Sequence, residues 1–320
     1  MFPRDIGGCY RPDVNEQRYR TSEECVWAEV GVAPRERVVV LPRIGTRLRV
    51  QETGAGPPIV FVHGASNSGT SWSSLAARLA DFRCVLIDRP GCGLSEPHGR
   101  RFRDVAELAR FSEELVVDVL DAVDIEREQL VGTSYGGGIV LRATARHPER
   151  VERLACLGWS VGAPIARVPV SMRMATIPVL GSLSYRLPAT KRMVKIVLKQ
   201  VGLRDAFANG MISDAFVDCF RSLLNDTDTM ANELKQGPPL VRPLRGFNAD
   251  VLLPDDVLAR VTVPTMFVWG TNDPMGDETT ARPFAAKVPG ATLELMPGGH
   301  AVWVDDPERV AASLRTFFSS

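Results

Sequence analysis

The segment Gly132-Thr133-Ser134-Tyr135-Gly136 constrains the fold of this chain more than any other part of its sequence. It follows a short apolar run and precedes a stretch rich in small residues, which is typical of a tight turn from a strand into a helix. In such a turn the serine takes a strained backbone conformation that pushes its hydroxyl into a cleft. The flanking glycines let strand and helix approach closely, because a Cβ there would clash. The competing interpretation is an ordinary glycine-rich turn with a solvated serine.

Strand and helix patterns alternate along most of the chain. Continuous apolar runs indicate strands that are buried on both faces, and apolar residues at the helical period indicate helices between them. An antiparallel hairpin is expected over 38–41 and 48–52, strands over 59–62, 84–87, 154–159, 265–269 and 292–296, and helices over 72–79, 104–123, 135–146, 278–287 and 307–318. This order predicts an α/β protein with a mostly parallel sheet that is covered by helices on both faces.

The alternation is interrupted once, which suggests how the chain is organised. Residues 163–250 have helical periodicity without convincing strands, and they are interpreted as a helical cap inserted over the sheet. The α/β core then comprises 35–162 and 251–320. Residues 1–34 are polar and irregular, and they are expected to form an N-terminal extension on the surface.

Composition excludes several classes of protein. The chain has 320 residues, 45% of them hydrophobic, with 38 basic and 38 acidic side chains, so it lacks the basic balance of a nucleic-acid binder. Its six cysteines have no spacing typical of a zinc or redox motif, and no metal site is expected. Residues 1–19 are charged and lack an apolar h-region, so no secretory signal is expected, and no apolar run reaches the roughly 18 to 20 residues of a membrane span. We therefore expect a cytoplasmic protein that does not insert into membranes.

Three residues have the types and the chain order needed for acyl transfer. Ser134 is the candidate nucleophile, His300 in the loop after the last strand is the candidate base, and Asp273 just past an earlier strand would orient that base. The carboxyl ends of the strands are where catalytic groups of open α/β sheets gather. Asp277 is the nearest rival for the orienting role. Among the other histidines, His98 lies in a polar loop, His147 at a helix end and His63 after a buried strand.

The oxyanion donors should be backbone N–H groups. One is expected from Tyr135, directly after the nucleophile and at a helix N-terminus. The second is assigned to Ala65, with Ser66 or Asn67 as alternatives. His63, Gly64 and Ser66 of the same loop are expected to contact the substrate.

At this point the chain resembles a known family, the α/β-hydrolase fold family, in its capped branch. Four segments carry the resemblance: 61–64 (Phe-Val-His-Gly), 88–95 (Asp-Arg-Pro-Gly-Cys-Gly-Leu-Ser), 132–137 around Ser134, and 298–300 (Gly-Gly-His) ahead of Asp306-Pro307. It covers about 38–160 and 255–318. The resemblance implies an eight-stranded, mostly parallel sheet, a Ser–His–Asp triad, no metal or organic cofactor, and a lid over 163–250.

Departures from related enzymes narrow the expected reaction. Haloalkane dehalogenases and epoxide hydrolases of this fold have aspartate where this chain has Ser134. Hydrolases of carbon–carbon bonds usually have tryptophan after the catalytic histidine and a more glycine-rich oxyanion loop, whereas this chain has Ala301 and Ala65-Ser66-Asn67. We therefore expect a carboxylic ester hydrolase that works through an acyl-enzyme.

The expected substrate is a small apolar molecule. Met172, Met174 and Ile177 of the cap are predicted to shape a lipophilic site for small-to-medium acyl groups, because methionine suits adaptable apolar pockets. The alternative is that they pack the core of the cap itself. Thioester, lactone, amide or C–C hydrolysis, cofactor-free perhydrolysis and a non-catalytic ligand receptor remain competing hypotheses. A monomer or a homodimer is expected.

Overall fold

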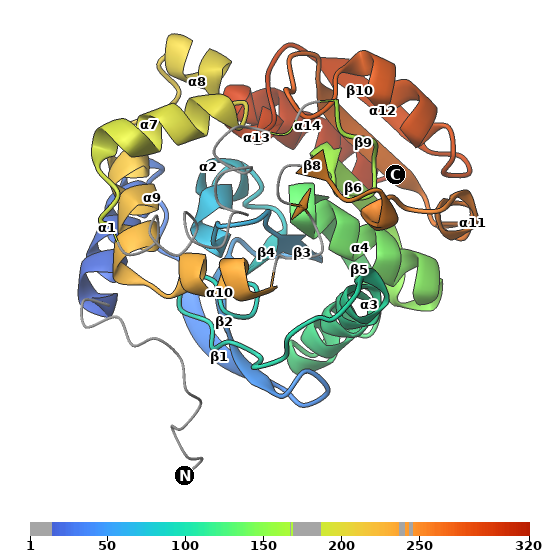
Figure 1. The fold of residues 1–320 in the computed structure, drawn as a ribbon, viewed down its shortest axis with the longest axis horizontal. Helices are drawn as coiled ribbons and strands as arrows, with labels where there is room; N and C mark the ends of the chain where they lie inside the picture. Colours follow the sequence, from blue (N-terminus) through green and yellow to red (C-terminus); the bar gives the residue numbers. More distant parts are fainter. Residues whose placement is uncertain (1–14, 167, 169–186, 237–240, 243–245) are drawn as a thin grey trace.

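The structure is a computed structural model that describes residues 15–166, 168, 187–236, 241–242 and 246–320. Its centre is a sheet of eight strands in the order β1-β2-β4-β3-β5-β6-β9-β10 (Figure 1). β2 is antiparallel to both β1 and β4, and all other neighbours are parallel. The strands are β1 Arg35–Leu41, β2 Thr46–Thr53, β3 Pro58–Val62, β4 Arg83–Ile87, β5 Glu128–Thr133, β6 Val151–Ser160, β9 Thr265–Gly270 and β10 Thr292–Met296. The predicted eight-stranded, mostly parallel sheet is confirmed, including its N-terminal hairpin.

Both faces of the sheet are apolar and covered by helices. Successive residues of a strand point to opposite faces, so Val60 and Val62 belong to one core cluster whereas Ile59 and Phe61 belong to another. Each such side chain stabilises the fold by about 1.5–3 kcal/mol when fully buried. The first cluster includes α3 Val105–Ala122, α4 Ser134–Arg146 and α12 Glu278–Ala285, and the second includes α2 Ser73–Ala76, α13 Val302–Asp305 and α14 Pro307–Phe318.

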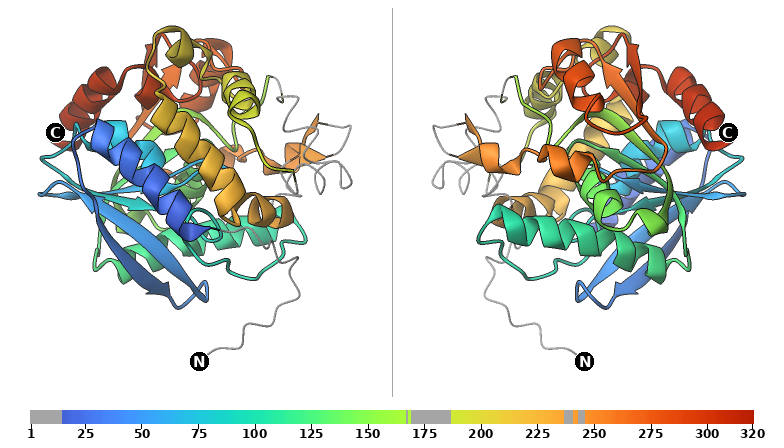
Figure 2. Two further views of the ribbon diagram at one scale, coloured as in Figure 1. Left: turned by 90° about the vertical axis from the view of Figure 1, so that its left-hand side faces the viewer. Right: turned by 90° about the vertical axis from the view of Figure 1, so that its right-hand side faces the viewer.

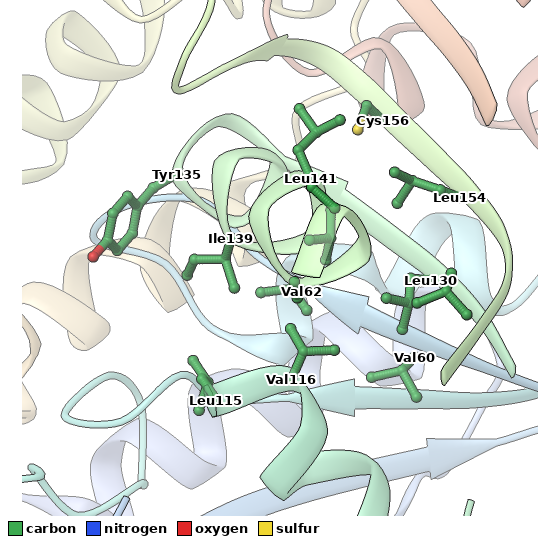
Figure 3. Close-up of a cluster of buried hydrophobic side chains, with 14 of the residues drawn as sticks. Val60, Val62, Leu115, Val116, Leu130, Tyr135, Ile139, Leu141, Leu154 and Cys156 are labelled. Carbon is green, nitrogen blue, oxygen red and sulfur yellow. The ribbon is translucent and has the colours of Figure 1, made fainter. Parts of the chain in front are cut away.

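Helix α4, which begins at Ser134, lies very close to the sheet. In the close-up, Ile139 and Leu141 of this helix lie among strand residues that include Val62 (Figure 3). A Cβ on Gly136 would lie 2.1 Å from the carbonyl oxygen of Val62, and one on Gly132 would lie 2.6 Å from Val140 Cγ2. The prediction that glycines permit a close approach here is confirmed.

Several short elements complete the core, and one expectation is corrected. The helix predicted over 72–79 is a 3₁₀ turn η1, Gly69–Trp72, followed by the single turn of α2. Beyond α2 the turns continue through tighter hydrogen bonds, from Arg78 N to Leu75 O and from Leu79 N to Ala76 O. The other short elements are η2 Pro148–Arg150, η3 Ala249–Val251 and α11 Asp255–Leu258.

Among the described residues of 163–250, where a helical insertion was predicted, there are four helices, which we call the inserted helices. They are α7 Lys191–Gln200, α8 Arg204–Ala208, α9 Asp214–Asp226 and α10 Thr229–Gln236. A two-stranded ribbon, β7 Val241–Arg242 and β8 Gly246–Phe247, also lies in this stretch, although no strand was expected there. Its strands are two residues long, too short for a periodic pattern. Met172, Met174 and Ile177 lie outside the described residues.

The N-terminal stretch, which was expected to be irregular, contains a helix. Helix α1, Glu16–Glu29, packs along α9 of the inserted helices (Figure 2). The apolar periodicity of this segment is too weak to predict a helix, because one of the residues on its buried face, Glu23, is charged. Glu23 receives two hydrogen bonds from Arg49, at 2.7 and 2.9 Å, and Arg49 also donates to Asp88 at 3.0 Å. Sequence periodicity cannot reveal a helix face that is anchored by an ion pair.

Candidate active site

Ser134 stands at the junction of β5 and α4. Its φ is +52°, a conformation that a non-glycine residue rarely adopts, as the turn pattern predicted. The carbonyl oxygen of Ser134 accepts a hydrogen bond from Val161 N at 2.9 Å, and Ser134 pairs with Ser160 through an isolated bridge. These contacts hold the turn against the end of β6 and leave the serine partly exposed.

Asp273 and His300 lie together at the same edge of the sheet. Nδ1 of His300 lies 2.8 Å from Oδ2 of Asp273, and both residues are buried. The carboxylate is itself oriented by two backbone N–H groups, from Trp159 at 3.0 Å and Met275 at 2.9 Å. A carboxylate only accepts hydrogen bonds, so Nδ1 carries the proton and Nε2 is left able to accept one.

The end of β6 connects these two parts of the site. Trp159 binds Asp273 through its backbone and its ring centroid lies 6.4 Å from that of His300, while Ser160 bridges to Ser134. Within the described chain, no hydrogen bond joins Ser134 to His300. In structures without substrate this bond is often long or misaligned, and it tightens in the substrate complex.

The loop after β3 lies against Ser134. A Cβ on Gly64 would be 3.0 Å from Ser134 Cβ and 3.6 Å from its Oγ. Ala65 is exposed, and Ser66 is half-buried with φ +50°. In the described residues the Ala65 N–H donates to no protein group, and the Tyr135 N–H is in the first turn of α4, where helical N–H groups have no intrahelical partner. Both are therefore free to bind an anion beside Ser134.

His63, which was predicted to contact the substrate, has both ring nitrogens hydrogen-bonded within the protein. It is fully buried, and its Nδ1 donates to Gly64 O at 2.7 Å while its Nε2 accepts from Arg89 N at 2.9 Å. Burial lowers the pKa of His63 well below its usual value, and the neighbouring Arg89 lowers it further. His63 thus stays neutral, and its two hydrogen bonds join the loop after β3 to the backbone of Arg89.

Two further residues of this region were not singled out from the sequence. Arg89 donates to the carbonyl oxygens of His63 and Gly64, both at 3.0 Å, and to Oε1 of Glu233 at 2.5 Å. Arg89 was part of the family motif at 88–95, which was its only signal. Glu233 of α10 had none, because a glutamate on a helix is ordinarily solvated.

The other candidate aspartate, Asp277, and the remaining histidines have contacts that differ from those of Asp273 and His300. Asp277 caps α12, where its carboxylate accepts from Thr279 N at 2.9 Å, and it is exposed. His98 is buried between the rings of Phe102 and Phe111. His147 lies 3.3 Å from Glu149 beyond the end of α4. Turn and cap chemistry therefore accounts for Asp277.

Comparison with known proteins identifies the family. A profile described as "Alpha/beta hydrolase family" matches residues 59–313, well over half of the chain. The chain belongs to this family. The family and the sheet topology agree, so the predicted membership is confirmed and the protein is a hydrolase-type enzyme.

Individual relatives are more distant. An uncharacterized protein of Mycobacterium tuberculosis is 28% identical over 281 residues, which cover 86% of this chain and 79% of that one. A 2-hydroxy-6-oxononadienedioate/2-hydroxy-6-oxononatrienedioate hydrolase of Cupriavidus pinatubonensis is 25% identical over 255 residues, 78% of this chain and 82% of that one. The crystal structure of carboxylesterase CesB from Bacillus subtilis superposes with a TM-score of 0.74 at 18% identity, covering 94% of this chain and 97% of that one. This last likeness shows the fold alone.

Helices able to span a membrane and clusters of metal ligands are both absent from the described residues. None of the helices in this part of the chain combines the length and apolarity needed to span a membrane. Likewise, among these residues no three His, Cys, Asp or Glu side chains gather as metal ligands would.

Proposed function

We propose that this α/β-hydrolase cleaves carboxylic esters through an acyl-enzyme, with Ser134 as nucleophile, His300 as general base and acid, and Asp273 as the group that orients His300. The observation that carries the proposal is the buried 2.8 Å contact between His300 Nδ1 and Asp273 Oδ2 at the sheet edge where the strained Ser134 turn lies. It leaves the other imidazole nitrogen able to take a proton, which a serine hydroxyl needs to become a nucleophile.

Each step of the reaction has a residue to perform it. His300 takes the Ser134 proton as the hydroxyl attacks the carbonyl carbon, and Asp273 stabilises the imidazolium that forms. The N–H groups of Ala65 and Tyr135 bind the oxyanion, and each such donor is worth about 2.7–4 kcal/mol of transition-state stabilisation. His300 then protonates the leaving alcohol and activates the water that releases the acid.

The substrate class is proposed to be esters of small-to-medium apolar acids. Residues 163–250 would form the cap over the site, with Met172, Met174 and Ile177 lining the acyl pocket. Gly64 and Ser66 would contact the reacting ester, since Gly64 lies against Ser134 and Ser66 is partly open to solvent.

Carbon–carbon bond hydrolysis is the second candidate, because the relative from Cupriavidus pinatubonensis is named as a hydrolase of this kind. The same nucleophile and base would serve. Against it, Ala301 follows His300 where tryptophan is usual in such enzymes.

The test compares Ser134→Ala with a control serine on α14, Ser313→Ala. We expect Ser134→Ala to lose hydrolysis of p-nitrophenyl esters and labelling by a fluorophosphonate while its unfolding transition is retained, and Ser313→Ala to keep both activities. A panel of esters of graded chain length, thioesters, amides and vinylogous diketones separates the reaction classes. Full ester turnover by Ser134→Ala would refute the assignment.

A further inference from the structure

The carbonyl oxygen of Gly64 is held by two donors. His63 Nδ1 lies 2.7 Å from it and Arg89 Nη2 lies 3.0 Å from it, while Arg89 Nε binds the preceding carbonyl, that of His63, at 3.0 Å. Arg89 therefore binds the carbonyl groups of two consecutive peptides in the loop after β3, which lies beside Ser134.

The orientation of one peptide group fixes the oxyanion donor. The Gly64 carbonyl and the Ala65 N–H belong to the same peptide, which is planar and trans, so they point in opposite directions. When Arg89 and His63 hold the carbonyl on one side, the Ala65 N–H is aimed to the other side. A cationic donor on the carbonyl also polarises the peptide, which strengthens the N–H as a donor.

Arg89 is in turn held by an inserted helix. Its Nη2 lies 2.5 Å from Glu233 Oε1 on α10, and the two side chains are only 4% and 14% exposed. The Arg89 guanidinium also lies 4.6 Å from the centroid of the Tyr135 ring. If the carboxylate partner is removed, the positive charge of the buried guanidinium is left uncompensated. We then expect the Arg89 side chain to shift away from its present position.

Helix α10 is also attached to the 89–93 loop, which carries Arg89, through two residues other than Glu233. Asn232 Nδ2 donates to Gly91 O at 3.0 Å, and Thr229 Oγ1 accepts from Gly93 N at 2.9 Å. Neither contact touches Arg89. The helix can therefore remain docked when the ion pair is broken, which lets an experiment separate docking from the pair itself.

We propose that Arg89 and Glu233 form a positioning pair, which aims the Ala65 N–H at the oxyanion and so couples the oxyanion hole to the placement of helix α10. Neither side chain touches substrate. The inference rests on the proposed function, since it assigns a role in the same reaction.

The experiment measures kcat and KM on a p-nitrophenyl ester for Arg89→Met, Glu233→Gln, the double variant and the matched control Asn232→Ala. Loss of one oxyanion donor costs about 10²–10³ in kcat, so misaiming one is expected to lower kcat by about 10- to 100-fold. KM should stay within about twofold, because the donor acts mainly in the transition state. The double variant should be no slower than Arg89→Met, since residues that act as one unit are not additive.

The control and a rescue distinguish positioning from a general packing defect. Asn232→Ala removes a neighbouring contact of α10 with the 89–93 loop and should lower kcat by less than about threefold, since it leaves the oxyanion donors in place. Arg89→Lys keeps a positive charge at position 89 but can reach only one of the two carbonyls, so its kcat should lie between those of Arg89→Met and the wild type. Equal losses in Asn232→Ala and Glu233→Gln, additive effects of the pair, or a change in KM alone would overturn the proposal.

A readout without turnover separates this inference from the proposed function. Hydrogen–deuterium exchange of the backbone amides of 62–68 should rise in Arg89→Met and Glu233→Gln and stay unchanged in Asn232→Ala. If the wild-type protein hydrolyses no ester but exchange changes in this way, the function is wrong and the coupling stands. If exchange is unaltered in both pair variants, the coupling is wrong whatever the reaction.

Discussion

Gly202 and Glu233, both from the described part of the insertion, contact the sheet edge that carries the candidate triad, and the two contacts differ in kind. Between α7 and α8, Gly202 lies against the His300 loop, where His300 N donates to Gly202 O at 3.3 Å and a Cβ on Gly202 would lie 2.7 Å from His300 N. The second contact is the ion pair between Glu233 and Arg89, and Arg89 in turn binds the loop after β3 through the carbonyls of His63 and Gly64. The first contact depends on the absence of a side chain, and the second depends on a charge.

The difference shows which half of the site depends on the insertion. The His300 ring is oriented by Asp273, whose own partners, Trp159 and Met275, are not on the inserted helices, and Gly202 O accepts from the backbone N–H of His300. The Gly64 carbonyl is held by Arg89, which takes its counter-charge from α10. The core therefore builds the half of the site proposed for acid–base chemistry, whereas the insertion completes the half proposed to bind the oxyanion.

The largest expected effect tests the core-built half. Asp273→Asn keeps the shape of the side chain but replaces one acceptor oxygen with an NH₂ group, which would face the N–H groups of Trp159, Met275 and His300. The imidazole then takes the wrong tautomer, and kcat should fall by about 10⁴-fold. The matched control is Asp277→Asn, which replaces one good helix cap with another and should leave kcat and stability almost unchanged. Steady-state kinetics on the same ester measure both. Comparable losses would mean that Asp273 was wrongly assigned.

A smaller effect is expected at the steric contact. Gly202→Ala adds a Cβ at φ +108° and within 2.7 Å of His300, so it should displace the histidine loop. Misplacement of a catalytic group by about 1 Å can cost about 10²-fold, and we expect kcat to fall about 10- to 100-fold.

Gly210→Ala is the control for the strain itself. Gly210 also has a positive φ, +71°, but its Cβ would meet nothing within 4 Å. This variant should lose up to about 1–3 kcal/mol of stability with kcat unchanged. A loss of kcat in Gly210→Ala as large as in Gly202→Ala would break the distinction between the two contacts.

The smallest effect concerns pH near the same histidine loop. Asp305 accepts a hydrogen bond from Gly299 N at 2.8 Å. Burial raises its pKa from 3.8 to about 6, with a further contribution from the nearby Asp205 and Asp273. The folded state therefore holds this proton more tightly than the unfolded state, and Asp305 makes the free energy of unfolding fall as pH rises from about 4 to about 6.

Asp305→Asn removes that contribution. The stability of the variant minus that of the wild type should increase between about pH 4 and pH 6 and stay level above pH 6. Urea unfolding at several pH values measures this difference. A difference that decreases with pH over that range would contradict the raised pKa of Asp305.

Local patterns predicted the core elements well. The strand expected at 292–296 is β10 with the same bounds, and the helix expected at 307–318 is α14. These elements are specified by which of their own residues are apolar, and that information is local. Helix α1 was missed because its docking depends on Glu23 meeting Arg49, a residue far along the chain.

The sequence by itself determined the class of fold and the identity of the candidate triad, because a strained turn needs glycines around its serine and chain order restricts the partners. The tertiary structure decided how the oxyanion loop is held. It made His63 a buried support and joined Arg89 to Glu233, two residues 144 positions apart. A buried charge is costly unless it is paired, and the convergence of two such residues in space leaves no mark on either residue's neighbours in the chain.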